Sequence, residues 1–165
     1  FTGGSTKGQL GGFKQSSLIE NGGNSYKVES FGGFANGGNS VPFNELELYL
    51  MGLIPSSSVS EFDVFSDITS FSSSGSEFNF SANSRITHDG KSIENLLGKR
   101  IPNSNNSQKN FKLLIVVLTN KTLTDEQWDK VDATAEWFSK KEDDGTHLYN
   151  FWEATNGIGS ITIEN

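Results

Sequence analysis

The stretch VPFNELELYLMGLIP, residues 41–55, carries the clearest helix signals in the chain. Asn44 can cap a helix, and Glu47 three residues later can close a capping box with it. Gly52 can end the helix, because glycine readily adopts the left-handed conformation of a C-terminal cap. We predict a short, mostly buried helix near residues 45–52. Its apolar face repeats at helical spacing through Leu46, Tyr49, Leu50 and Leu53.

The most apolar stretch of the chain is FKLLIVVLT, residues 111–119. Apart from Lys112 it is apolar as far as Leu118, and polar residues bound it, which is typical of a central strand covered on both faces. We therefore predict that residues 111–119 form the central strand of a small sheet. The later segment GSITIE, residues 159–164, can add a last strand.

The remaining periodicities predict more helices and strands, which together indicate an α+β fold. Further helices are predicted near residues 92–97, 124–141 and 147–155. The long one has a capping box of Thr124 and Gln127. Its inward stripe is predicted at Trp128, Val131, Ala135 and Phe138. Alternating apolar residues predict peripheral strands around Phe62, Val64, Phe78 and Phe80.

The chain begins with a glycine-rich lead, residues 1–40, which holds 11 of the 18 glycines. It contains NGGNS twice, at residues 21–25 and 36–40, and these pairs supply the positive φ angles of tight turns. Between them SYKVESF predicts a short strand. We predict one domain over residues 1–165, with this lead followed by an α+β body over residues 41–165. Because the chain starts at Phe1, we expect a fragment or processed form of a larger protein.

Composition excludes several classes of protein. The 165 residues carry a net charge of −7, which opposes attraction to nucleic acid. The longest apolar run has six residues, against about 20 for a membrane-spanning helix. There is no cysteine, so disulfides, thiolate nucleophiles and cysteine-bound zinc are impossible.

Few residues are candidates for catalysis, metal binding or ligand binding. The two histidines, His88 and His147, lack a second ligand at zinc-binding spacing, so no self-contained zinc site is predicted. Glu47 is best explained as a helix cap. Trp137 falls off the predicted inward stripe and is the candidate for stacking on a sugar, although aromatic residues here are more often core.

Three segments resemble a known family. VPFNELELYLMGLIPSSSV resembles the Y-S-P-L-[DE]-L-Y-L-M-G-L-I-P-x-x-[ED]-V segment of large secreted bacterial zinc-peptidase-like proteins of the HExxH type. Here Phe43 and Asn44 stand for the Tyr-Ser, and Glu45 replaces the Pro. GKRIPNSNNSQKNFKLLIVVLTNKTLTDEQWDKVD and FWEATNGIGSITI resemble two later segments of that family. The resemblance covers nearly the whole chain.

The resemblance implies the region that follows the metal-binding helix, since the family's H-E-x-x-H motif lies upstream and does not occur here. With such an upstream segment, Glu47 is implied as a third metal ligand. Met51 is implied as the apolar floor beneath the metal, and Tyr49 as a support of the cleft. The chain alone is expected to bind no cofactor, and zinc would belong to the parent protein.

Three functions follow as hypotheses. The first is the C-terminal portion of a secreted, extracellular bacterial zinc-metallopeptidase-like protein, inactive alone, whose partner is the upstream segment of the same precursor. The second is a non-catalytic extracellular module that assembles with other copies of itself or binds a surface through exposed strand edges. The third is carbohydrate binding through Trp137.

Overall fold

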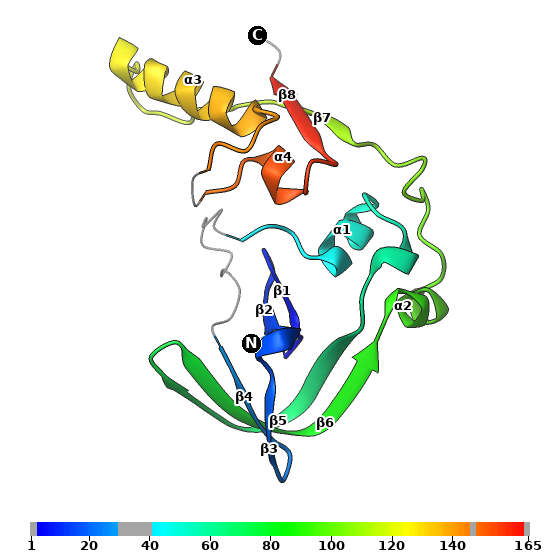
Figure 1. Ribbon diagram of the computed structural model, residues 1–165. Coiled ribbons are helices and arrows are strands. Elements are labelled where there is room, and N and C mark those ends of the chain that lie inside the picture. The colour runs from blue at the N-terminus through cyan, green and yellow to red at the C-terminus, as the bar shows by residue number, and fades with distance from the viewer. Residues whose placement is uncertain (1–2, 30–40, 146–147, 164–165) are drawn as a thin grey trace.

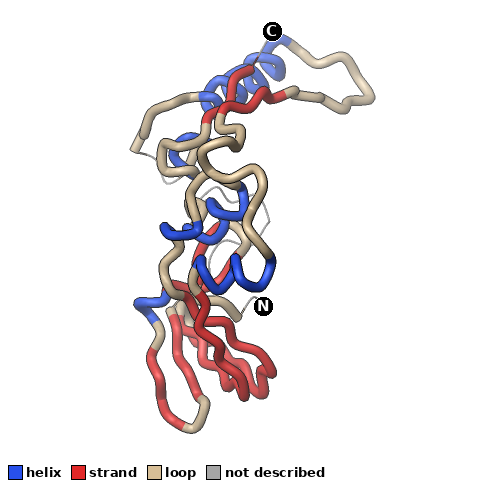
Figure 2. The backbone as a smooth tube through the Cα atoms, turned by 90° about the vertical axis from the view of Figure 1, so that its right-hand side faces the viewer, coloured by secondary structure: helices blue, strands red, loops and turns tan. Residues whose placement is uncertain are grey.

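The computed structural model describes residues 3–29, 41–145 and 148–163. It confirms the α+β class, with three small sheets and four α-helices in these ranges. The molecule is elongated, with the larger sheet at one end and α3, β7 and β8 at the other (Figures 1 and 2). None of the helices described is both long and apolar enough to cross a bilayer.

The elements follow one another in mixed order, with short strands at both ends of the chain. The strands are β1 (Thr6–Gly8), β2 (Gly11–Lys14), β3 (Ile19–Gly22), β4 (Ser25–Val28), β5 (Phe62–Ser74), β6 (Glu77–His88), β7 (Asn110–Leu113) and β8 (Ser160–Ile163). The helices are α1 (Glu45–Met51), α2 (Gly90–Leu97), α3 (Asp125–Ser139) and α4 (Phe151–Ala154), with 3₁₀ turns at Gln15–Ser17 and Ser56–Ser58.

The largest sheet is antiparallel, in the order β3-β4-β6-β5. Its framework is the long β5–β6 hairpin, which closes through a turn at Gly75 with a φ of 61°. The prediction that these strands are peripheral holds for β5, which forms one edge of the sheet, and is wrong for β6, which lies inside it between β4 and β5. The sequence alternation marked the strands but could not show how far they extend into the serine-rich stretch before the turn.

The main core lies on this sheet and is supplied partly by the glycine-rich lead. Phe13, Tyr26 and Val28 of the lead pack with residues of the hairpin. The ring centroids of Tyr26 and Phe65 lie 4.7 Å apart, edge to face, and those of Phe65 and Phe80 lie 5.1 Å apart. The turn predicted at residues 21–25 is present, with positive φ at Gly23 and Asn24. The second NGGNS, at residues 36–40, lies outside the described residues.

A buried carboxylate fastens the lead to the hairpin. Asp63 is 1% exposed and accepts hydrogen bonds from Arg85 (2.9 Å), Thr87 (2.6 Å) and Gln15 (2.8 Å). Burial alone would raise the pKa of the Asp63 carboxyl, but these donors outweigh it and hold the pKa below 3.8. Arg85 also bonds to Glu20 and lies over the rings of Tyr26 and Phe65.

The predicted helices are present with changed ends. The helix near residues 45–52 is α1, and the one near 92–97 is α2, whose cap is Asp89 rather than Ser92. The helix predicted over 124–141 is α3, with the expected capping box at Thr124. The one predicted over 147–155 is shortened to α4, which is capped by Asn150. Residue 147 lies outside the described ranges.

The prediction of a central strand over residues 111–119 is wrong. Only Asn110–Leu113 forms strand β7, which pairs in parallel with β8 in a separate two-stranded sheet. Among the described residues, the pairing extends as far as Leu113 opposite Ile163, and residues 114–119 belong to no strand. An apolar run shows that its side chains gain from being covered, but it forms a strand only where a neighbouring strand can pair with it. Here α3, a helix, covers one side of the run.

Replacing Asp63 by Asn should make stability less dependent on acidic pH. Because the pKa of the Asp63 carboxyl is lower in the folded chain than the ordinary 3.8, the folded state binds fewer protons than the unfolded state. The stabilisation is therefore fully present above about pH 4 and is lost as the pH falls through the folded pKa. Urea unfolding of wild type and Asp63→Asn from neutral pH to about pH 2.5 measures the difference.

Asp67→Asn is the matched control for this experiment. Asp67 is exposed on the same strand, and its positive φ of 53° is one that asparagine tolerates. We expect this variant to keep the wild-type dependence on pH. Identical pH slopes for wild type and Asp63→Asn would contradict the role given to the Asp63 carboxylate.

Candidate binding surface

The residue predicted as a metal ligand, Glu47, is 5% exposed near the start of α1. Its carboxylate accepts backbone N–H bonds from Asn44 (2.9 Å), Gln9 (3.2 Å) and Leu10 (2.6 Å). The Asn44 side chain accepts in return from the Glu47 N–H at 2.9 Å, which completes the predicted capping box. Glu47 therefore joins the β1–β2 turn to α1, and both of its oxygens are already engaged.

The residues predicted to support a cleft do not gather around Glu47. Tyr49 is buried in a second core cluster with Val59 and Phe62. Met51 is the last residue of α1 and is half-buried. Among the described residues, no cluster of three metal-type ligands includes Glu47 or a histidine. By themselves, these residues do not fit a zinc site, and a role for Glu47 beside an upstream segment stays a prediction.

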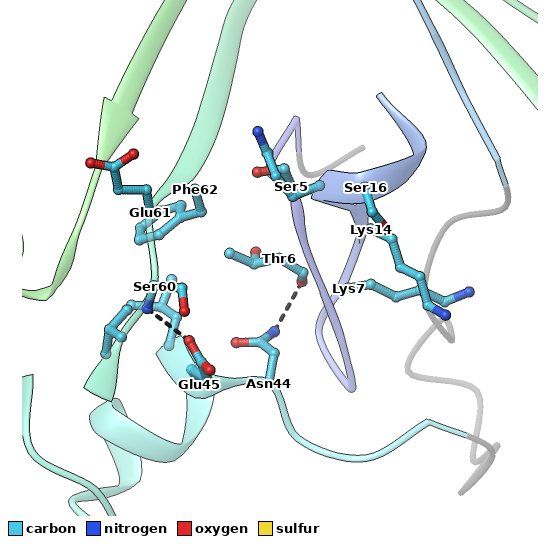
Figure 3. A pocket seen from close by; sticks show the side chains of 13 residues that line it. Ser5, Thr6, Lys7, Lys14, Ser16, Asn44, Glu45, Ser60, Glu61 and Phe62 are labelled. Atoms are coloured by element: carbon cyan, nitrogen blue, oxygen red, sulfur yellow. Dashed lines mark hydrogen bonds between the residues drawn. The ribbon is translucent and has the colours of Figure 1, made fainter. Parts of the chain in front are cut away.

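A polar cavity of about 380 Å³ lies beside α1 (Figure 3). It is bordered by β1 and β2 on one side and by the start of β5 on the other, with Phe62 among its lining residues. Asn44 Nδ2 donates to the Thr6 carbonyl at 2.9 Å, and the Ser60 N–H donates to Glu45 Oε2 at 2.7 Å. Several of its polar groups are thus used to hold the surrounding elements together.

Trp137, the candidate for sugar stacking, lies near the end of α3 and is half-buried. Its Nε1 donates to Asp144 Oδ2 at 2.9 Å, and the Asp144 N–H donates to Glu153 at 3.2 Å. The indole therefore belongs to a chain of contacts that links α3 to α4. Asp143, Asp144 and Glu153 form an acidic group whose hydrogen bonds hold the turn before α4.

The most distinctive surface lies where the segment after β7 crosses α3 (Figure 1). We call this surface the α3 face and define it as residues 113–118 with Trp128, Val131, Ala135 and Phe138 of α3. No residue of α3 is fully buried, and Trp128 is 45% exposed although it was predicted to point inward. The predicted helical stripe exists, and Val131, Ala135 and Phe138 are only half-buried beside the segment that crosses them.

The segment over α3 alternates between two environments. Leu113, Ile115 and Val117 line both cavities against the helix, although Leu114 also borders the larger one and Ile115 is 38% exposed. Leu114, Val116 and Leu118 are 83%, 68% and 93% exposed. A period of two in exposure is typical of an extended segment with one face on a neighbour.

Two cavities flank this segment, one on each side. The larger, about 590 Å³, has Asp132 and Glu136 among its lining residues. The smaller, about 460 Å³, is almost wholly apolar and is lined by Val131, Ala135 and Phe138 with Lys130 and Thr134. The smaller cavity is a concave, largely apolar surface of the kind where proteins hold ligands and partner side chains. The arrangement can bind an apolar partner.

Sequence reasoning missed this surface because it predicted that each of its parts was buried. The run at 111–119 and the stripe of α3 were both expected to find cover. Both elements need apolar neighbours, yet the chain has few other long apolar segments that could cover them. That mismatch is the sequence feature that could have indicated an uncovered apolar surface.

Comparison with known proteins adds no assignment, because no protein-family model, curated protein or solved structure matches this chain. A function is therefore inferred from the geometry of the described residues and from the segments at residues 41–59, 98–132 and 151–163.

Replacing Glu47 by Gln should destabilise the fold. The neutral amide has one acceptor oxygen in place of two, so it cannot accept all three backbone N–H groups that the carboxylate holds. We expect a loss of about 1.5–3 kcal/mol in the free energy of unfolding, the range for hydrogen bonds to a charged group. Urea denaturation at neutral pH measures it.

Glu45→Gln provides the control on the same helix. Glu45 is exposed and accepts a single backbone bond, which the amide oxygen of glutamine can still accept. Its cost should stay below about 1 kcal/mol. Gly8→Ala should also destabilise, because a Cβ at position 8 would overlap Glu47 Oε2 and Asn44 Nδ2. Equal stabilities of Glu47→Gln and Glu45→Gln would contradict the structural role of Glu47.

Proposed function

We propose that this chain is a non-catalytic docking module that joins a larger protein or assembly through the α3 face. The observation that carries the proposal is the exposure of Leu114, Val116 and Leu118 on a segment flanked by two cavities. Exposed apolar residues are ordinary when scattered singly, whereas contiguous ones beside concave surface are characteristic of interaction sites.

The positions of the polar residues support a structural role for the rest of the molecule. The carboxylates of Glu47 and Asp63 are both occupied as acceptors that join separate elements. His88 lies against the Phe62 ring, with centroids 5.8 Å apart, and its Nδ1 is 3.5 Å from Ser92 Oγ. These groups hold elements together and do not converge on a common reacting position.

The wider context of the proposal comes from the sequence. The segments at residues 41–59, 98–132 and 151–163 resemble the region after the metal-binding helix in secreted bacterial zinc-peptidase-like proteins. We therefore propose that the chain belongs to the supporting portion of such an extracellular protein. Zinc and catalysis would reside in the segment that the α3 face helps to hold.

The non-catalytic part of the proposal predicts no peptidase activity and no bound zinc from these 165 residues. The purified chain, incubated with excess Zn²⁺ and then desalted, should retain far less than one zinc per chain by atomic emission. It should also fail to cleave a fluorescein-labelled casein. Stoichiometric zinc together with casein cleavage would contradict the proposal.

The docking part predicts that the outward side chains of the α3 face can be replaced at little cost. Val116→Thr/Leu118→Thr should change the free energy of unfolding by less than about 0.5 kcal/mol, because these side chains have little to pack against. If residues 116 and 118 were core positions in solution, the double change would cost several kcal/mol, of the order of 2–5 per large truncation. Urea unfolding separates the two results.

The same variant should lose binding of the apolar dye anilinonaphthalene sulfonate to the folded protein. We expect wild type to enhance the fluorescence of the dye and the double variant to lose at least half of that enhancement. Ile19→Thr/Ile86→Thr is the matched control, since it removes two exposed apolar side chains, 52% and 54% exposed, from the far sheet. Equal loss in both variants would contradict a localised docking surface.

A further inference from the structure

We infer that the polar cavity beside α1 binds a small zwitterion, a molecule that carries an ammonium and a carboxylate on an apolar body. Apolar α-amino acids and ω-amino acids share this chemistry. The cavity has no lining residue in common with the two cavities of the α3 face, so the inference is independent of the docking function. It follows from the size and buried lining of the cavity, from the charges on its two sides and from the contacts of those charges.

The size and the buried lining of the cavity suit a small molecule. Its volume of about 380 Å³ lies at the low end of the range for small-molecule sites, which is roughly 300–1,000 Å³. Val59 and Phe62 are 7% and 5% exposed and Leu46 is half-buried, so these three give the cavity an apolar portion. Such a portion can hold the apolar body of a ligand while polar groups around it fix the ligand's orientation.

Charges of both signs line this one cavity, and they lie on different sides of it (Figure 3). Lys7 of β1 and Lys14 of β2 form the lysine side. Glu45, the first residue of α1, and Glu61, directly before β5, form the glutamate side. The charges of the lining therefore balance, although the chain as a whole carries a net charge of −7. A ligand with one charge of each sign can face both sides without repulsion.

The charged groups on both sides can contact a ligand. Lys14, Glu45 and Glu61 are exposed. Among the residues that the structure describes, the side chains of Lys14 and Glu61 form no ion pair or hydrogen bond with each other or with any other group. Glu45 Oε2 accepts from the Ser60 N–H at 2.7 Å, which orients the carboxylate and leaves Oε1 for a further donor. Opposite charges that line one cavity without pairing can each pair with a ligand held between them.

Ligands of other charge types match this cavity less well. The glutamate side repels a simple anion, and the lysine side repels a simple cation. A neutral sugar can hydrogen-bond to both sides, but it brings no charge to offset the cost of taking the lysine and glutamate side chains out of water. A zwitterion offers a carboxylate to the lysines, an ammonium to the glutamates and its body to the apolar portion.

The test titrates the whole chain with leucine and with ε-aminocaproate, which carry the two charges close together and far apart, and follows the backbone amide signals by NMR. At least one should bind with a Kd of about 1 mM or lower and shift the amide signals of Thr6, Ser16 and Glu61. Leucinamide lacks the carboxylate and isocaproate lacks the ammonium, so each should bind at least tenfold more weakly. The inference is overturned if neither zwitterion binds, or if a single-charge analogue binds as tightly.

Two variants assign the charges to the two sides. Lys14→Met should weaken binding of the zwitterion about threefold or more and leave leucinamide, which has no carboxylate, unchanged. Glu61→Gln should weaken the zwitterion similarly and leave isocaproate unchanged. Lys99→Met and Asp129→Asn are the matched controls, because both residues are exposed and line none of the cavities described above. Equal losses in these controls would show that the ligand senses only the net charge of the chain, and the inference would fail.

The remaining outcomes separate this site from the docking surface and from sugar binding. Val116→Thr/Leu118→Thr should leave the Kd of the zwitterion unchanged, because neither residue lines the cavity beside α1. Ligand-induced shifts confined to residues of the α3 face would overturn the inference. Methyl glucoside should bind at least tenfold more weakly than the better zwitterion, and equal binding would overturn the selection by charge. Urea unfolding of Lys14→Met and Glu61→Gln should match wild type, since both side chains are exposed.

Discussion

The buried carboxylate of Glu47 is the contact on which the arrangement of the lead and the body depends. A glycine-rich lead has little side-chain surface with which to fix its own conformation, and it pays the largest entropy to become ordered. Glu47 offsets this cost by accepting the N–H groups of Gln9 and Leu10 while it caps α1. The close approach is possible because position 8 is glycine, where a Cβ would overlap the carboxylate.

Asp63, like Glu47, is a buried carboxylate that joins the lead to another part of the chain. The Asp63 carboxylate accepts hydrogen bonds from Gln15 of the lead and from Arg85 and Thr87 of the hairpin. The Asp63 backbone N–H donates to Ser5 Oγ at 2.7 Å. Two buried acids thus secure a segment that periodicity alone would class as loop. Each acid is satisfied by several donors, which is what makes its burial tolerable. The core residues Phe13, Tyr26 and Val28 are delivered to the sheet by these anchors.

Features that depend on residues close together in the sequence could be predicted, whereas features that depend on distant residues could not. The capping boxes at Asn44 and Thr124 were predictable, because a cap involves residues three apart and its chemistry is local. The class of fold followed from the same local patterns. The place of β6 inside the sheet depended on pairing with β4, some fifty residues earlier, and no local pattern records that register. Residue type alone pointed to Trp137 and Met51 as candidate functional residues. The α3 face could not be found in this way, because it exists only where few described residues cover the apolar side chains of the segment and α3.

The run at residues 111–119 shows why hydrophobicity alone misleads. Apolar content reports how much burial a segment would gain, at about 25 cal/mol per Å² of surface removed from water, and does not say which molecule provides the cover. In this chain α3 covers one side of the run and leaves Leu114, Val116 and Leu118 in solvent. Apolar content thus measures how much a segment gains from cover, whereas the arrangement of its neighbours decides which of its sides is covered.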